Sequence, residues 1–161
     1  MIRDATPADA VAVALIWNHY IRDTNATFNS AEKSVEEVRA TITTRLETRC
    51  FLVAEHAGRV QGFATYDQFR GGIGYAKTME HTIQLAPDSG GNGFGRALMA
   101  ALEAHATIAG AHVMVAAVTG ENATGRDFHA RMGYVQVGLM PQVGRKFGRW
   151  MDLLLMQKIL S

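Results

Sequence analysis

The sequence predicts an α/β (α+β) fold in which helices flank a mixed central sheet within a single domain. The chain has 161 residues, which is long enough for one sizeable core and short for two. Hydrophobic residues make up 48% of the chain and charged residues 19%, a composition typical of globular proteins and not of disordered ones. Helical and extended apolar patterns alternate over residues 1–161, with no repeat, low-complexity tract or linker between them.

The first third of the chain carries the start signals of two helices. Thr6-Pro7-Ala8-Asp9 combines an N-cap residue, a proline in the first turn and an acidic residue, and an apolar stripe follows as far as Tyr20. Ser34-Val35-Glu36-Glu37 has the spacing of a capping box, which predicts a second helix through about Glu47. The segment between the two helices is polar apart from Phe28, so we expect a loop there.

From Phe51 onward the apolar pattern changes from helical to extended. The runs Phe51–Glu55 and Val60–Phe69 flank a short turn at Ala57-Gly58-Arg59, which predicts a hairpin. The run Lys77–Ala86 alternates as a strand does and is stopped by Pro87. The remaining predicted elements are a helix from Phe94, a strand over His112–Val118, a helix from the cap Asn122 to Arg131, and strands over Tyr134–Gln142 and Arg149–Lys158.

Charge and composition exclude several classes of function. The 16 Lys and Arg nearly balance the 15 Asp and Glu, whereas a nucleic-acid binder needs a clustered basic face. The one basic cluster, residues 145–149, is expected to be a solvated loop. The longest wholly apolar run near the middle of the chain, Val113–Val118, is far shorter than the roughly 20 residues that cross a bilayer. Without a secretory signal and with Cys50 as its single cysteine, the chain is expected to be cytoplasmic, with neither nucleic-acid nor membrane partners.

A glycine-rich segment lies between the predicted strand that ends near Ala86 and the next helix. It contains Gly90, Gly91, Gly93 and Gly95. Glycine lets main-chain N–H groups approach an anion, and a helix N-terminus adds about half a positive charge. These features predict a phosphate cradle, and the alternative is a strand-to-helix turn that needs positive φ angles.

Two common phosphate-binding motifs are excluded for this segment. A dinucleotide fingerprint does not fit, because the third glycine comes one position early. A Walker A loop does not fit, because no lysine followed by Ser or Thr closes the segment. The ligand is therefore expected to be a different phosphate-bearing molecule.

Several motifs in the right order resemble those of one enzyme family. The segment Leu85–Leu98 resembles the acyl-CoA pyrophosphate loop of the GNAT superfamily of N-acetyltransferases. Five further segments resemble its phosphinothricin/methionine sulfoximine N-acetyltransferase subgroup: Phe69-Arg70, Thr78-Met79-Glu80-His81, His112–Ala117, Glu121-Asn122-Ala123 and Val143–Asp152. The resemblance implies acetyl transfer from acetyl-CoA, as cosubstrate and without a metal, to the α-amine of a small amino-acid-like substrate.

Three residues are candidates for the chemistry. Transfer to an amine requires the neutral amine, and a positioned carboxylate assists its deprotonation. Glu80 matches the subgroup's glutamate, and the alternative is a strand glutamate paired with His81 or a neighbouring arginine. The resemblance assigns the oxyanion donor to the main-chain N–H of Leu85. His129 lies where many GNAT enzymes place a tyrosine that protonates the leaving thiolate, and the alternative is a packed or solvated helix histidine with unassisted departure of the thiolate.

The resemblance also implies where acetyl-CoA binds. The strand that holds Ile83, Gln84 and Leu85 is expected to splay from its neighbour and to leave main-chain groups free for the pantetheine arm and the thioester. Asn122 matches an asparagine that contacts this arm, in addition to its role as a helix cap. Gly90 departs from the family, which usually has Arg or Gln there. The pyrophosphate is expected on the main chain of Gly91, Asn92, Gly93, Phe94, Gly95, Arg96 and Ala97, with added charge from Arg96.

The substrate pocket is the least determined part of the resemblance. Arg70 is the natural partner of an anionic substrate, because its planar guanidinium binds a carboxylate or phosphinate through two bonds. Gly71 and Gly72 follow it where close relatives often have bulkier residues. Asn18 and Phe28 are further candidates for the pocket. The alternative for Arg70 is a surface arginine without a ligand.

These observations predict an acetyl-CoA-dependent N-acetyltransferase for substrates of the methionine sulfoximine, methionine sulfone or phosphinothricin type. Two alternatives remain: acetylation of protein or peptide N-termini, and a non-catalytic CoA-binding module. A nicotinamide oxidoreductase is the weakest interpretation, because the glycine spacing is wrong. The family also implies a homodimer.

Overall fold

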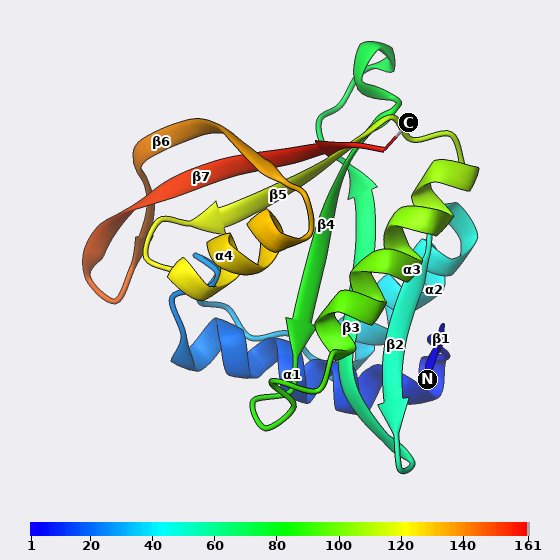
Figure 1. Ribbon diagram of the computed structural model, residues 1–161. Coiled ribbons are helices and arrows are strands. Elements are labelled where there is room, and N and C mark those ends of the chain that lie inside the picture. The colour runs from blue at the N-terminus through cyan, green and yellow to red at the C-terminus, as the bar shows by residue number, and fades with distance from the viewer. Residues whose placement is uncertain (161) are drawn as a thin grey trace.

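The computed structural model describes residues 1–160 and contains one seven-stranded sheet in the order β1-β2-β3-β4-β5-β7-β6 (Figure 1). Neighbouring strands are antiparallel except β4 and β5, which are parallel, so the predicted mixed sheet is confirmed. The strands are β1 (Ile2–Asp4), β2 (Phe51–His56), β3 (Arg59–Gln68), β4 (Thr78–Leu85), β5 (Val113–Thr119), β6 (Val135–Lys146) and β7 (Arg149–Ile159). The helices are η1 (Pro7–Asp9), α1 (Ala10–Asp23), α2 (Val35–Thr48), η2 (Ile73–Tyr75), α3 (Phe94–Ile108) and α4 (Ala123–Arg131).

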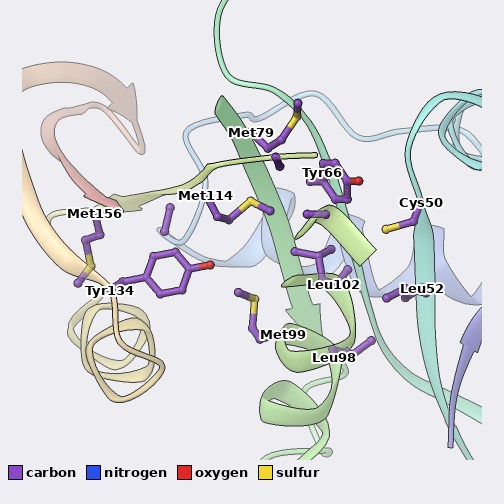
Figure 2. Close-up of a cluster of buried hydrophobic side chains, with 14 of the residues drawn as sticks. Cys50, Leu52, Tyr66, Met79, Leu98, Met99, Leu102, Met114, Tyr134 and Met156 are labelled. Carbon is purple, nitrogen blue, oxygen red and sulfur yellow. The ribbon is translucent and has the colours of Figure 1, made fainter. Parts of the chain in front are cut away.

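Helices cover both faces of the sheet and enclose two hydrophobic cores. The core beneath α1 and α2 includes Val13, Ile16, Val38, Ile42, Phe51, Val53 and Phe63. The core on the α3 and α4 side, shown in Figure 2, includes Leu52, Tyr66, Met79, Leu98, Met99, Leu102, Met114 and Met156. β2 contributes to both cores, because successive side chains of a strand point to opposite faces.

The local signals that predicted helices and turns are confirmed. The Ser34 side chain accepts a hydrogen bond from the Glu37 N–H at 3.1 Å and caps α2. Asn122 Oδ1 accepts from the Gly125 N–H at 2.9 Å and caps α4. The β2–β3 hairpin turns through Ala57 and Gly58, both at positive φ (50° and 74°), which suits the twist of the two strands.

The basic segment, residues 145–149, is the exposed hairpin turn that its charge run predicted, except at Lys146. Residues 145–149 form the closed end of the β6–β7 hairpin, and the whole Lys146 residue is only 4% exposed. Its ammonium donates to the main-chain oxygens of Tyr20 (3.3 Å), Thr24 (2.7 Å) and Thr27 (2.8 Å). Burial lowers the pKa of Lys146. The prediction was wrong for Lys146 alone, because carbonyl groups from a distant segment take the place of water around this charge.

The pairing between β4 and β5 is limited to the start of β4. β4 and β5 pair at Thr78–Val113, Met79–Met114 and Glu80–Val115, and no further pairing joins them. β3 remains paired with β4 as far as Leu85. The two parallel strands therefore diverge after Glu80, as the resemblance implied, and Figure 1 shows the resulting gap above α1. Within residues 1–160, no helix is long and apolar enough to span a membrane.

Candidate active site

The divergence of β4 from β5 leaves main-chain groups of β4 without a strand partner. The N–H of Phe69 bonds to the Thr78 oxygen (2.9 Å) and the N–H of Ala86 bonds to the Gln61 oxygen (2.8 Å). In an antiparallel strand, the main-chain N–H and C=O groups of successive residues point alternately toward the partner strand and away from it. The main-chain groups of the even-numbered residues of β4 therefore bond to β3. The N–H groups of Ile83 and Leu85 consequently face the gap, whereas the main chain of Gln84 faces β3.

Glu80 lies at the point where the two strands separate. In the strand register, Glu80 is opposite Asp67 of the neighbouring strand β3. The half-buried Glu80 carboxylate has no hydrogen bond or ion pair within residues 1–160. The pairing with His81 or an arginine that was the alternative interpretation is therefore absent from this part of the chain. Burial raises the pKa of Glu80, which makes its carboxylate a stronger base than a solvated glutamate.

His81 and His129 form a buried pair on the opposite face of β4. Their Nε2 atoms are 2.9 Å apart, and both residues are 7% exposed. His81 Nδ1 lies 3.1 Å from the Val115 oxygen and His129 Nδ1 lies 2.7 Å from the Gly125 oxygen. Both ring nitrogens of His129 thus have partners within the protein, and in this geometry neither is available to donate a proton to a leaving thiolate.

The glycine-rich segment forms the N-terminus of α3. Gly91 and Gly93 have φ angles of 80° and 78°, and a Cβ on either would meet no atom within 4 Å, so backbone conformation and not space requires glycine there. The first intrahelical bond runs from the Ala97 N–H to the Gly93 oxygen, and the N–H groups of the preceding turn are therefore free to bind an anion. Gly91, Asn92, Gly93 and Arg96 are exposed.

α3 and α4 meet beside the end of β4. A Cβ on Gly95 would lie 3.3 Å from the Phe128 ring and 3.5 Å from a Leu85 methyl group, so a small residue at position 95 lets the two helices and the strand approach. Asn122 caps α4 through its Oδ1. The structure thus brings Leu85, the glycine-rich segment and α4 together at one end of the gap.

The predicted substrate residues lie on separate elements. Arg70, Gly71 and Gly72 belong to the exposed turn between β3 and β4, and Figure 1 shows this turn at the opposite end of β4 from the glycine-rich segment. The Gln68 amide donates to the oxygens of Arg70 (2.8 Å) and Gly72 (2.9 Å) and shapes the turn. The Arg70 guanidinium lies 5.5 Å from the Tyr75 ring and has no carboxylate partner within residues 1–160.

Asn18 and Phe28 hold the loop between α1 and α2. Asn18 exchanges two hydrogen bonds of 2.8 Å with the main chain of Lys33, so its amide anchors the end of the loop. The Phe28 ring packs so closely on Gly144 that a Cβ there would lie 2.4 Å from it. The loop is therefore fastened to β6 as well as to α1.

Sequence reasoning missed three residues near the gap. Tyr20 was assigned only to an apolar stripe, yet its hydroxyl donates to the Leu85 oxygen at 2.6 Å. Lys146 and Gly144 were placed in a motif without individual roles, yet both hold the loop that follows α1. No local signal identifies such residues, because their partners are far away in the sequence.

Comparison with known proteins identifies the family of the chain. The family model for the acetyltransferase (GNAT) domain matches residues 2–155. The L-methionine sulfoximine/L-methionine sulfone acetyltransferase of Pseudomonas aeruginosa is 38% identical over 158 residues, covering 97% of this chain and 92% of that protein.

Two solved structures share the fold over nearly their whole length. An acetyltransferase from Salmonella typhimurium, solved with its cofactor acetyl-CoA, superimposes with a TM-score of 0.96 at 36% identity, covering 100% of this chain and 94% of that one. A ribosomal-protein-alanine N-acetyltransferase from Brucella melitensis superimposes with a TM-score of 0.95 at 37% identity, covering 99% of both chains. The chain therefore belongs to the GNAT family of acetyltransferases and is an N-acetyltransferase.

Proposed function

We propose that the protein transfers an acetyl group from acetyl-CoA to the α-amine of a small amino-acid-like substrate of the methionine sulfoximine, methionine sulfone or phosphinothricin type. One observation carries the proposal: within residues 1–160 the half-buried Glu80 carboxylate is unpaired, and it lies where β4 leaves β5, on the strand whose end at Leu85 has N–H groups without a strand partner. Residues 1–161 act as one N-acetyltransferase domain in this proposal, which the single continuous sheet supports.

Glu80 acts as the general base. Its carboxylate accepts a proton from the substrate ammonium, directly or through water, and the neutral amine then attacks the thioester carbonyl carbon. The Leu85 N–H donates to the oxygen that becomes negative in the transition state. A C–N bond forms and the C–S bond breaks, and the attacking nitrogen releases its second proton to solvent as the amide forms. The thiolate takes its proton from solvent, because both nitrogens of His129 are engaged.

The residues at the gap fit the chemistry of acetyl-CoA. The main-chain groups of Ile83 and Leu85 offer hydrogen bonds to the amide-rich pantetheine arm. The exposed N-terminus of α3, from Gly91 to Ala97, offers N–H groups and the Arg96 charge to the pyrophosphate. Asn122 can contact the arm through its amide nitrogen, because only its oxygen is used in capping α4. Gln84 contributes a side-chain oxygen that is buried without a partner.

Substrate selection is assigned to Arg70 and to the loop that carries Phe28. Arg70 has no carboxylate partner within residues 1–160 and can bind a carboxylate or phosphinate through its planar guanidinium. Gly71 and Gly72 keep the turn beside it open. Asn18 acts on the pocket by anchoring the loop through Lys33.

The active form in this proposal is a homodimer that uses the β6–β7 hairpin. Large hydrophobic side chains are normally buried, and a contiguous exposed set indicates an interface. The β6–β7 hairpin exposes a run of them: Val135, Val137, Leu139, Met140, Val143, Phe147 and Trp150. Sedimentation of the purified protein gives its mass and decides this point.

A second substrate class is the N-terminus of a protein. The similarity to a ribosomal-protein-alanine N-acetyltransferase favours it. Arg70 favours a compact anionic substrate instead, because its guanidinium can bind a carboxylate or phosphinate. A protein N-terminus would require an open groove. The non-catalytic alternative predicts CoA binding without thiol release.

One experiment separates these possibilities. Thiol release from acetyl-CoA is measured with a panel of amino acids, methionine sulfoximine, methionine sulfone, phosphinothricin and short peptides. We expect the highest kcat/KM with a sulfoximine, sulfone or phosphinate. A preference for peptides would replace the proposal with the second class, and CoA-dependent thermal stabilisation without thiol release would show a binding module.

A further inference from the structure

The last peptide unit of β4 is held at both of its polar groups. Its oxygen, from Leu85, accepts the Tyr20 hydroxyl at 2.6 Å, and its N–H, from Ala86, donates to the Gln61 oxygen at 2.8 Å. By the strand alternation, the Leu85 oxygen points away from β3 toward the gap that β5 has left. Tyr20 therefore supplies a hydrogen bond at a point where the sheet supplies none.

This bond matters because it controls the direction of the neighbouring peptide. The Leu85 N–H belongs to the preceding peptide unit, which is joined to the fixed one through the Leu85 Cα. A strand end with a partner on one side only can twist about that partner. With the following peptide fixed at both polar groups, the Leu85 N–H is confined to one direction into the gap.

Tyr20 is itself held by the edge strand β6. Lys146 donates to the main-chain oxygen of Tyr20 and, beyond it, to those of Thr24 and Thr27. The Tyr20 hydroxyl lies in a half-buried position, and burial raises its pKa, so it remains a donor across the physiological range. A continuous path of contacts thus runs from the β6–β7 hairpin through the end of α1 to the end of β4.

We propose that Tyr20 is a positioning residue for acetyl transfer: its hydroxyl aims the Leu85 N–H at the thioester oxygen, and Lys146 holds Tyr20 in place. The inference rests on the proposed function, because it assigns Tyr20 to the same site. Tyr20 contacts neither substrate nor acetyl-CoA in this role. Its effect passes through the main chain of β4.

Tyr20→Phe tests the proposal, because it removes the hydroxyl and keeps the ring. We expect kcat to fall about tenfold, less than the 10²–10³-fold loss typical when an oxyanion donor itself is removed, while the KM of the amine stays within about twofold. Amide hydrogen exchange of the segment 83–86 should become faster. This second readout needs no activity.

Tyr66→Phe is the matched control. The Tyr66 hydroxyl is also hydrogen-bonded, to His105 Nδ1 at 2.9 Å, and lies outside the gap. We expect this variant to keep the kcat of the unsubstituted protein and its exchange at 83–86. A loss of kcat equal to that of Tyr20→Phe would show a general effect of stability and would overturn the proposal.

The remaining outcomes are decisive as well. An unchanged kcat in Tyr20→Phe, with or without faster exchange, overturns the positioning role. A fall in kcat without faster exchange also overturns it, because the effect would not pass through the strand end. If the unsubstituted protein releases no thiol with any amine, the proposed function fails, and the exchange measurement then tests separately whether Tyr20 holds the end of β4.

Discussion

His81 and His129 face each other through their Nε2 atoms at 2.9 Å, with both Nδ1 atoms turned to main-chain oxygens. A main-chain oxygen only accepts, so each of the three contacts needs a proton on a ring nitrogen, whereas two neutral rings carry two protons. This pair joins β4, one residue after Glu80, to α4, the helix that Asn122 caps.

The buried pair predicts loss of stability in acid. Burial lowers the pKa of His81 to about 3 and lowers that of His129. Because the unfolded chain binds protons near the ordinary histidine pKa, the stabilisation is complete above about pH 6.5 and is lost as the pH falls toward the folded-state pKa values. Below pH 6.5 the free energy of unfolding should fall by up to about 1.4 kcal/mol per pH unit for each histidine.

Urea unfolding at about pH 7.5, 6 and 5 checks this expectation. His81→Gln should make the slope of stability against pH shallower. His56→Gln, at an exposed strand end, is the control and should keep the slope. A slope that is the same in all three proteins would remove the pair as its source.

Glu80→Gln should abolish most of the turnover while keeping acetyl-CoA affinity. The substitution keeps the shape of the side chain and removes its ability to accept a proton, for which the typical loss is about 10²–10⁴-fold. In the unsubstituted enzyme, kcat/KM should rise with pH through an apparent pKa above the ordinary glutamate value, because burial raises the pKa of Glu80. Retained turnover at pH 7 would exclude Glu80 as the base, and calorimetry with acetyl-CoA tests the affinity.

Gly93→Val should abolish acetyl-CoA binding without unfolding the protein. Gly93 has a φ angle of 78° at the start of α3, where a β-branched residue costs about 1–3 kcal/mol and turns the N–H groups of the first turn. Gly58→Val is the matched control, because its φ angle of 74° brings similar strain in the distant β2–β3 turn. Equal affinity of both variants for acetyl-CoA in calorimetry would contradict the cradle.

Gly90→Arg should strengthen acetyl-CoA binding. Gly90 has ample space, since a Cβ would meet no atom within 4 Å, and its φ angle is not in the left-handed region. An arginine adds a charge beside the proposed pyrophosphate site, for which we expect roughly a tenfold lower Kd at low salt. Gly90→Gln should have a smaller effect, and a Kd equal to that of the unsubstituted protein would place the pyrophosphate elsewhere.

Gly144→Ala should displace Phe28 and raise the KM of the amine. A Cβ at this position would lie 2.4 Å from the Phe28 ring, so the ring and its loop must shift, at a cost of about 1–3 kcal/mol. Gly138→Ala on the same strand is the control, because its Cβ would lie 3.9 Å from Leu155. A loss of stability with an unchanged KM would show that Phe28 does not line the pocket.

Much of the fold could be predicted because its signals are local. The caps Ser34 and Asn122, the hairpin turn at Ala57-Gly58 and the alternation of β4 depend on residues a few positions apart, and the structure confirms each of them. The three-residue strand β1 was not predicted, because so short a run carries no period. It is defined only by its pairing with β2.

For the site, the sequence predicted the positions of residues but not their partners. The sequence by itself determined the order of elements, the glycine-rich segment and the position of Glu80 on its strand, because these follow from periodicity, backbone conformation and motif spacing. The tertiary structure alone decided that the Glu80 carboxylate is unpaired among residues 1–160, that His129 is engaged by His81, and that Lys146 is buried. Contacts such as Tyr20 with Leu85 join residues 65 positions apart, and Lys146 reaches back 126 positions to Tyr20. The physical reason is that desolvation and hydrogen-bond partners depend on which distant segments the packing brings together, and a local pattern holds no record of them.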